Sequence, residues 1–254
     1  SIQIPITGVI GDQQAALYAQ CRRDVNLIKN TYGTGLFLMA NTGSTVSQSN
    51  DLLSTIAIGL NGKVDYAIEG SVFTGGSLIQ WLRDNLKLIE SANESEDIAN
   101  RVSTNAGVTI VPALSGLGAP YWLPQATGLI NGLTQKTTRD HIVRAALEAI
   151  ALQTNDLVEI VKNEFPKVPF KELLVDGGAS QNNWLMQLQA DISQMAVRRP
   201  KDVEATALGA ALVANHDTGF FKDINKNVTQ FKPQRKQTDL IQQWETAIQL
   251  IKTS

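Results

Sequence analysis

Cysteine and histidine are scarce in this chain, and their scarcity removes several classes of site. Cys21 is the single cysteine among 254 residues, so neither an internal disulfide nor a cysteine-based metal site can form. One cysteine also fits a reducing, cytoplasmic location. The two histidines, His141 and His216, are far apart in the sequence, and His141 near an expected helix start is interpreted as a surface residue. We therefore expect no metal site here, with a two-histidine site as the less favoured alternative.

An excess of one charge and a long hydrophobic run are also lacking. Lys and Arg number 22 against 24 Asp and Glu, so nothing in the net charge of −2 would attract nucleic acid or anionic lipid. The sequence holds no apolar run of the length a membrane span needs and no signal-peptide pattern. With 43% hydrophobic and 18% charged residues, the chain can bury a sizeable core. One large α/β domain or two small ones are compatible with its length.

The segment 26–70 is predicted to form an antiparallel β meander of about four strands. Its first two apolar runs, 27–29 and 36–40, flank the turn Gly33-Thr34-Gly35 and therefore indicate a hairpin. The next two runs are separated by Asn61-Gly62, a strong hairpin signal.

Beyond residue 70, helical patterns alternate with short strands. Leu78, Trp81, Leu82, Leu86 and Ile89 recur at helical spacing and predict a helix over 77–89. The remaining predicted elements are a strand at 108–112, a loop with a short strand over 112–135, a long helix from Thr138 to Pro166, a strand, glycine turn and helix over 171–195, a strand at 197–200, a small-residue helix over 204–221 and a final amphipathic helix. This order predicts an α/β fold with a mixed sheet.

Three glycine turns are candidates for binding phosphate or nucleotide. In "TYGTG" the glycines let backbone N–H groups approach an anion, and the Thr34 hydroxyl can donate to a phosphate oxygen. "FTGGSLIQW" places paired glycines at a helix start, with Gln80 within the next two turns. "DGGASQNN" follows an apolar strand, the position where α/β sheets bind ligands. Each turn has a purely structural alternative, such as a positive-φ glycine or an Asn cap, and the three together favour a nucleotide cleft.

The stretch "GDQQAAL" (residues 11–17) raises a separate question about Asp12. A carboxylate at a helix start is typical of an N-cap. Phosphoryl transfer to an alcohol also needs a carboxylate that accepts the hydroxyl proton. Both interpretations of Asp12 stay open at this point.

Five stretches together identify a resemblance that covers residues 10–250. "GDQQAAL", "KNTYGTGLFLMANTG", "YAIEGSVFTGGSLIQWLRD", "GLGAPYW" and "VDGGASQNNWLMQLQADI", the last followed by "ATALGAALVA", closely resemble glycerol kinases. These are FGGY carbohydrate kinases, within the actin-like ATPase superfamily. The resemblance implies that residues 1–254 form a ribonuclease H-like C-terminal domain, with the family's N-terminal domain outside this sequence. Leu123 and Thr127 depart from the family pattern, at positions with no expected role in chemistry.

The same resemblance implies roles for individual residues. Asp12 matches the catalytic base for the glycerol hydroxyl, Gln13 a glycerol-binding amide and Phe37 the aromatic that packs on the glycerol carbons. The residues that match nucleotide contacts are Thr34, Gly76, Gln80, Gly178 and Asn182. The implied reaction is ATP- and Mg²⁺-dependent phosphorylation of glycerol to glycerol 3-phosphate.

Two alternatives to glycerol kinase remain. One is an FGGY kinase for another polyol or ketose, and the other is a non-catalytic nucleotide-binding module. We expect this chain alone to have little activity, and we expect the full-length protein to be cytoplasmic and to form a homodimer or homotetramer.

Overall fold

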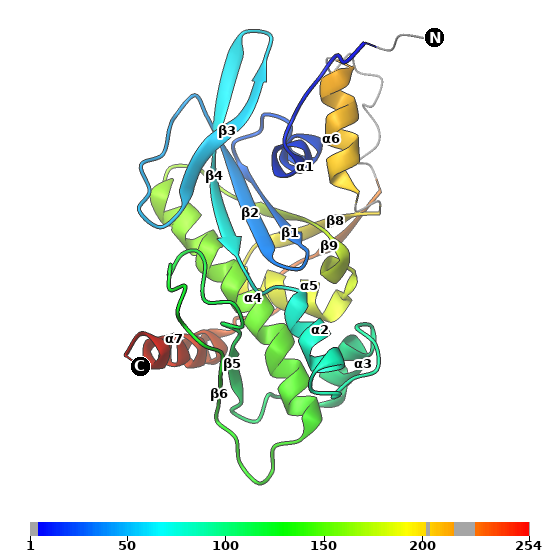
Figure 1. Cartoon of the computed structure of the whole chain (residues 1–254), viewed down its shortest axis with the longest axis vertical. Coiled ribbons are helices and arrows are strands. Elements are labelled where there is room, and N and C mark those ends of the chain that lie inside the picture. Colours follow the sequence, from blue (N-terminus) through cyan, green and yellow to red (C-terminus); the bar gives the residue numbers. More distant parts are fainter. Residues whose placement is uncertain (1–4, 202–203, 216–226, 254) are drawn as a thin grey trace.

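The computed structural model describes residues 5–201, 204–215 and 227–253. Within these residues seven strands form one sheet in the order β3-β4-β2-β1-β7-β8-β9 (Figure 1). The strands are β1 (Leu27–Tyr32), β2 (Leu36–Gly43), β3 (Leu53–Leu60), β4 (Lys63–Val72), β7 (Glu172–Asp176), β8 (Ala196–Pro200) and β9 (Val228–Phe231). Antiparallel pairs meet parallel pairs where β1 lies between β2 and β7, so the predicted mixed α/β fold is confirmed.

The four antiparallel strands β1–β4 form as predicted, although their order is not that of a simple meander. β1 and β2 make the hairpin around Gly33-Thr34-Gly35, and β3 and β4 make the hairpin at Asn61-Gly62. β4 pairs with β2, which leaves β3 at the sheet edge. Burial explains this order: β4 is largely buried, whereas Leu53, Ser54 and Ile56 of β3 are exposed. The strand that can be buried on both faces takes the inner place.

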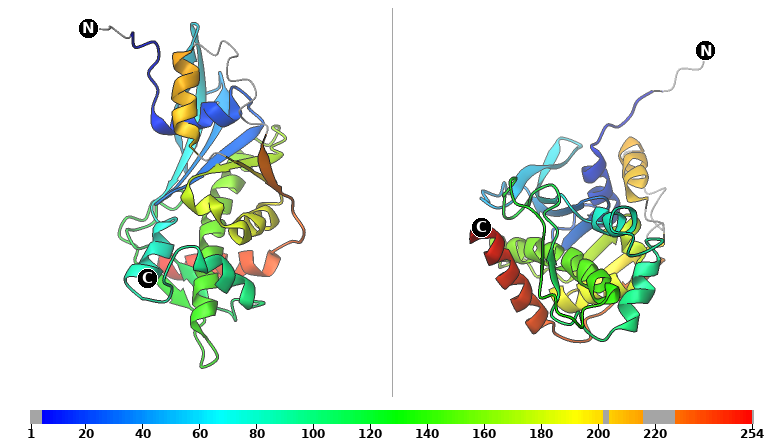
Figure 2. Two further views of the ribbon diagram at one scale, coloured as in Figure 1. Left: turned by 90° about the vertical axis from the view of Figure 1, so that its right-hand side faces the viewer. Right: turned by 60° about the horizontal axis from the view of Figure 1, so that its bottom comes forward.

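Helices cover both faces of the sheet (Figure 2). The long helix α4 (Arg139–Glu164) packs on one face beside α5 (Asn183–Ser193), and α1 (Asp12–Cys21) covers the other face beside α6 (Ala205–Ala214). The smaller elements on the α4 side are α2 (Ser77–Asp84), α3 (Glu94–Arg101), α7 (Thr238–Thr253), and the short strands β5 (Thr109–Val111) and β6 (Leu129–Asn131), which pair with each other.

Alternate residues of β1 separate the two layers. Ile28 and Tyr32 belong to the main core under α4, whereas Leu27 packs against the cluster on the opposite face. That cluster consists of Leu17 and Cys21 of α1 with Met39, Ala57, Ala67 and Leu174. The alternation follows from the two-residue period of a strand.

Several expected elements differ from the observed ones. α2 ends at Asp84, so Leu86 and Ile89 lie outside it, and the prediction of one helix to residue 89 is wrong; Ile89 is still buried in the core. α4 begins at Arg139, one residue after the expected start at Thr138, which is its N-cap and whose backbone N–H donates to Nδ1 of His141 over 3.1 Å. Neither α3 nor β9 was predicted, because both are short and polar. His216 and the end of the expected small-residue helix lie outside the described residues.

The small residues of α6 let it lie against α1. A Cβ atom added to Gly209 would lie 1.9 Å from the carbonyl oxygen of Ala15, so no larger residue fits without a shift of backbone. The close packing that the small-residue sequence predicts is therefore confirmed.

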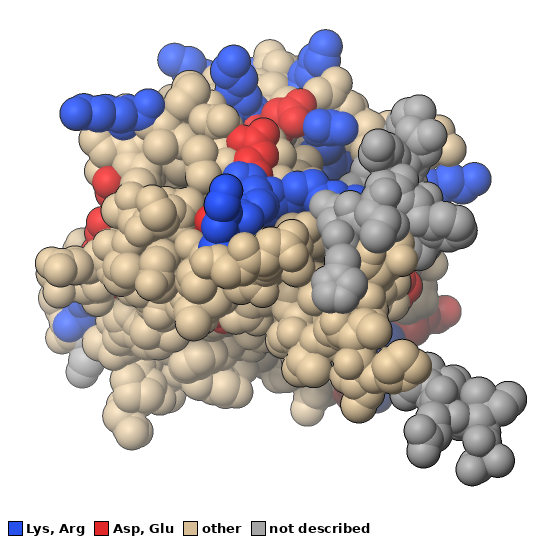
Figure 3. All heavy atoms as spheres, turned by 90° about the horizontal axis from the view of Figure 1, so that it is seen from above, with Lys and Arg blue, Asp and Glu red and all other residues tan. Residues whose placement is uncertain are grey.

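On the end of the molecule shown in Figure 3, acidic side chains adjoin basic ones near the middle of the view, and a broad uncharged surface lies below them. One contact between opposite charges is the ion pair of Arg23, after α1, with Asp65 of β4. Among the described residues no helix has both the length and the apolar composition needed to cross a membrane.

Candidate nucleotide and acceptor sites

Two of the three glycine turns are joined by backbone hydrogen bonds. The N–H of Gly76 donates to the carbonyl oxygen of Gly33 over 2.8 Å, and the N–H of Gly75 donates to that of Thr34 over 2.8 Å. The Ser77 hydroxyl also donates to the Thr34 carbonyl oxygen, over 2.9 Å. A Cβ on Gly76 would lie 2.7 Å from the Gly33 oxygen. The glycine is therefore required by this close backbone approach.

The third turn follows β7, on the far side of β1. Gly177 has a φ of +84°, and a Cβ there would lie 2.6 Å from the carbonyl oxygen of Tyr32. Gly178 begins the short 3₁₀ helix η1 (Gly178–Gln181), and no heavy atom lies within 4 Å of the position its Cβ would take. Gly177 thus makes the turn, while Gly178 leaves open space.

The three turns meet at a cavity of about 670 Å³. Its walls come from the β1–β2 turn, α2, α3, α4, η1 and α5, and its volume is typical of a small-molecule or cofactor site. The five residues predicted to contact nucleotide all line it: Thr34, Gly76, Gln80, Gly178 and Asn182. The fold therefore brings together stretches that are far apart in the sequence.

Asn182 also has the structural role that the sequence left open. It caps α5, with its Oδ1 accepting a hydrogen bond from the N–H of Leu185 over 2.8 Å. Its Nδ2 donates to the Ser95 hydroxyl of α3 over 3.3 Å. Because both ends of the amide have partners, Asn182 joins α5 to α3 at the cavity wall.

Sequence reasoning missed the α3 wall. Ser95 and Glu96 line the cavity, and Glu96 accepts hydrogen bonds from the backbone and side chain of Asn183 over 3.0 and 3.1 Å. A short polar helix carries little signal beyond the acidic residues of its first turn.

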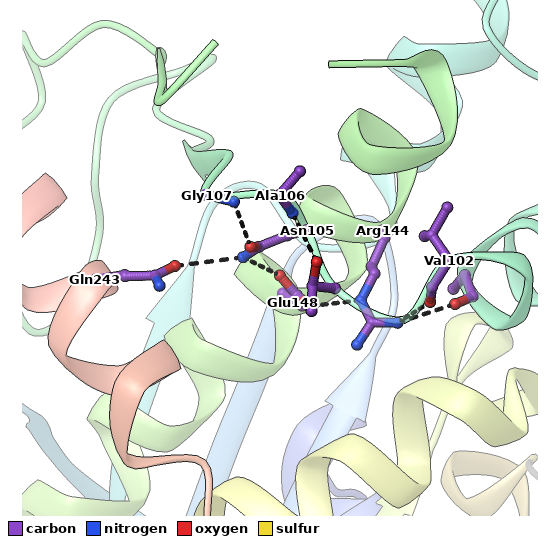
Figure 4. A network of polar contacts seen from close by, with 9 residues as sticks. Val102, Asn105, Ala106, Gly107, Arg144, Glu148 and Gln243 are labelled. Carbon is purple, nitrogen blue, oxygen red and sulfur yellow. Dashed lines mark hydrogen bonds and ion pairs between the residues drawn. The ribbon is translucent and has the colours of Figure 1, made fainter. Parts of the chain in front are cut away.

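A buried ion pair holds α3 in this place (Figure 4). The Arg144 guanidinium of α4 donates to Oε1 of Glu148 over 2.9 Å and to the carbonyl oxygens of Ala99 and Val102 at the end of α3. Asn105 donates to the other Glu148 oxygen over 2.8 Å. Burial raises the pKa of Glu148, and Arg144 opposes that shift. The ion pair therefore fixes the C-terminal end of α3, and the first turn of the same helix carries Ser95 and Glu96.

The predicted acceptor residues lie on the opposite side of the sheet from this cavity. Asp12 is the first residue of α1, whose N-cap is Gly11, so the interpretation of Asp12 as the N-cap is wrong. Its exposed carboxylate accepts a hydrogen bond from the N–H of Gln13 over 2.8 Å. Backbone conformation explains the difference: Gly11 is extended and its carbonyl oxygen accepts the first helical bond, from Ala15.

Phe37 lies on the sheet face that α1 covers. The strand register places Phe37 opposite Thr31 of β1 and Ser71 of β4, two pairs along from Met39 and therefore on the same face as Met39, which packs with α1. Phe37 is half-buried. Phe37 is three residues after Thr34, which lines the cavity. The β1–β2 turn therefore connects this face of the sheet to the cavity.

Three ionisable side chains share that face. Lys29 of β1 is fully buried and donates to Oε1 of Gln13 over 3.0 Å. Burial lowers the pKa of Lys29, while it raises the pKa values of Asp176 and Glu69. Oδ2 of Asp176 accepts a hydrogen bond from Nε2 of Gln20 over 2.6 Å.

Comparison with known proteins fixes the family. The model of the FGGY family of carbohydrate kinases, C-terminal domain, matches residues 28–218. The chain belongs to this family. A glycerol kinase of Aquifex aeolicus is 51% identical to this chain over 257 residues, and one of Limosilactobacillus reuteri is 49% identical. Each alignment covers 97% of this chain and 52% or 51% of the relative, so the chain spans about half the length of the curated relatives it matches.

Solved structures agree with the FGGY fold. A glycerol kinase of Plasmodium falciparum with ADP superposes with a TM-score of 0.89 at 37% identity, over 98% of this chain and 51% of the Plasmodium chain. A ligand-bound xylulose kinase of Lactobacillus acidophilus superposes with a TM-score of 0.73 at 19% identity, over 94% of this chain and 49% of the xylulose kinase chain. The second likeness concerns the fold alone.

Proposed function

We propose that this FGGY domain is the nucleotide-binding half of an ATP-dependent glycerol kinase, an enzyme that makes glycerol 3-phosphate. The observation that carries the proposal is the cavity where Thr34, Gly76, Gln80, Gly178 and Asn182 meet. The names of the relatives, glycerol kinases at about half identity, support glycerol as the acceptor. The remaining half of the enzyme, including further glycerol contacts, would come from the part of the full-length protein outside this chain.

In this proposal ATP occupies the cavity, and its phosphates lie by the joined glycine turns. Thr34, Gln80 and Gly178 are exposed to the space that the nucleotide would fill. The start of α2, next to Gly76, would turn the positive end of a helix dipole toward phosphate, while its first N–H groups are bonded to the β1–β2 turn. The ADP present in the Plasmodium structure supports nucleotide binding by proteins of this fold.

Mg²⁺ would accompany the nucleotide. The described residues contain no group of three His, Cys, Asp or Glu side chains that could hold a metal ion. Such an ion would be held mainly by ATP phosphates and water, the usual coordination of Mg²⁺ in kinases. When bound, the ion would neutralise phosphate charge.

The acceptor alcohol would lie against Asp12, Gln13 and Phe37. Asp12 accepts the proton of the terminal hydroxyl as its oxygen attacks the γ-phosphorus in line, and the bond from phosphorus to the ADP oxygen breaks. Gln13 hydrogen-bonds a glycerol oxygen, and the Phe37 ring covers the carbons. We expect the full-length enzyme to be a cytoplasmic homodimer or homotetramer.

Two measurements test the proposal. Calorimetric titration of the 254-residue chain with ADP is expected to show binding, and the full-length protein is expected to phosphorylate glycerol in preference to erythritol and xylulose. The isolated chain is expected to show little turnover. Preference for another acceptor would overturn the glycerol assignment, and nucleotide binding without turnover by the full-length protein would indicate a binding module.

A further inference from the structure

Lys29 is a buried cation directly beneath the proposed acceptor site. It lies in the middle of β1 with no exposed surface, and its ammonium donates to Oε1 of Gln13 over 3.0 Å. Its neighbours on the same sheet face, Met39 and Leu174, are apolar. A buried lysine is costly among such side chains, and an apolar residue in its place is often as stable or more stable. Packing alone therefore does not explain a lysine here.

The negative charges around Lys29 come from several elements. Asp176 at the end of β7, Asp12 of α1 and Glu69 of β4 all favour its charged form, whereas burial raises the pKa of the Cys21 thiol and keeps it neutral. Asp176 is itself fixed by the hydrogen bond from Gln20. Gln13 and Gln20 are seven residues apart and share one face of α1, so the sheet holds both ends of that helix by polar contacts.

The Lys29 contact decides which way the Gln13 amide points. An amide has an accepting oxygen and a donating NH₂ group, and an ammonium can only donate. Because Oε1 of Gln13 takes the bond from Lys29, the Nε2 group is the end left to face outward. If the amide were reversed, its NH₂ group would face the Lys29 ammonium. Both groups are hydrogen-bond donors, so no hydrogen bond could form between them.

We propose that Lys29 is a positioning residue for the acceptor alcohol: it orients the Gln13 amide so that Nε2 donates to a hydroxyl oxygen of the substrate. This role rests on the proposed kinase function. It also defines which substrate group Gln13 recognises: a hydroxyl oxygen that accepts a hydrogen bond. Lys29 acts through Gln13 and does not itself touch the substrate. The hydroxyl bound by Gln13 therefore differs in its role from the one that gives its proton to Asp12.

The test measures steady-state kinetics of the full-length protein and its variants. Lys29→Met is expected to raise KM for glycerol roughly ten-fold, the usual effect of losing one hydrogen bond, with KM for ATP within two-fold. Gln13→Ala is expected to do the same. The double variant is expected to be no worse than Gln13→Ala, because Lys29 acts only through Gln13. The exposed Lys63→Met on β4 is the matched control and is expected to behave as wild type.

Gln13→Glu tests the orientation without removing the buried lysine. The carboxylate keeps the contact with Lys29 and loses the NH₂ donor, so the melting temperature is expected to hold or rise while KM for glycerol rises roughly ten-fold. Lys29→Arg keeps a donor in place and is expected to recover most of the glycerol affinity that Lys29→Met loses. Gln13→Glu remains informative if Lys29→Met does not fold.

Different results would overturn this role and the proposed function. If Lys29→Met and Gln13→Ala add in the double variant, or if Gln13→Glu keeps the wild-type KM for glycerol, Lys29 does not act by orienting the amide. If wild-type protein binds ADP and phosphorylates no polyol, the proposed function fails first, and this role fails with it.

Discussion

The backbone N–H of Gly76 donates a hydrogen bond to the carbonyl oxygen of Gly33 over 2.8 Å. This single contact joins the start of α2 to the hairpin turn of β1 and β2, and both segments line the cavity proposed for nucleotide. It also explains why glycine is needed at residue 76, where any side chain would meet the Gly33 oxygen. Gly178, on the part of the wall formed by η1, differs in that the position its Cβ would take is open space.

Gly76→Ala and Gly178→Ala should therefore differ in effect. The first places a Cβ 2.7 Å from a backbone oxygen and is expected to destabilise the protein by about 1–3 kcal/mol. The second is expected to keep wild-type stability and to weaken ADP binding several-fold, since the methyl group enters the cavity. Urea unfolding and calorimetric titration with ADP measure the two effects. Equal loss of stability in both variants would contradict this distinction.

Asp12→Asn in the full-length protein is expected to lower kcat by about 10²–10⁴-fold, the usual contribution of a general base. Affinity for ADP should stay at the wild-type value, because Asp12 does not line the cavity. Asp140→Asn is the matched control, since Asp140 is also an acid in the first turn of a helix. Near-normal turnover of Asp12→Asn would refute the assignment of the base.

Gly209→Ala is expected to lower the free energy of unfolding by about 1–3 kcal/mol or more, because its Cβ would overlap the Ala15 carbonyl oxygen of α1. Gly59→Ala is the control: no heavy atom lies within 4 Å of the position its Cβ would take. Urea unfolding of both variants gives the comparison. A stable Gly209→Ala would mean that α6 can move away from α1 at little cost.

Asp156 is expected to make stability depend on pH. Burial raises the pKa of its carboxyl to about 7, although Tyr121 and Trp244 both donate to Oδ2, over 2.7 and 2.8 Å. In the unfolded chain the pKa is about 3.9, so between these two values the folded state holds a proton that the unfolded state has lost. The contribution of Asp156 to stability is therefore present below about pH 4 and is lost as the pH rises to about 7.

Asp156→Asn removes that titration. The wild type is expected to lose stability relative to this variant as the pH rises from 5 to 8, each unit of pKa difference corresponding to about 1.4 kcal/mol. Urea unfolding of both proteins at pH 5, 6, 7 and 8 measures the difference. A difference that stays constant over this range would show that Asp156 titrates alike in both states.

Local sequence patterns predicted most elements of the fold. Asn61-Gly62 and Gly33-Thr34-Gly35 specify their hairpins because turn conformation depends on adjacent residues. Thr138 predicted the start of α4, and the small residues of α6 predicted its close packing on α1. The motifs, together with the family resemblance, also predicted five of the residues that line the cavity.

Only the tertiary structure decided how these parts are joined. The sequence predicted four antiparallel strands, and differences in burial placed β4 between β2 and β3. No pattern linked Lys29 to Gln13, Asn182 to Ser95, or Arg144 to the end of α3. Periodicity shows which face of a helix or strand is buried, and it carries no information about the partner on the other side. Those partners are distant in the sequence, so their contacts exist only once the sheet and its two helical layers have formed.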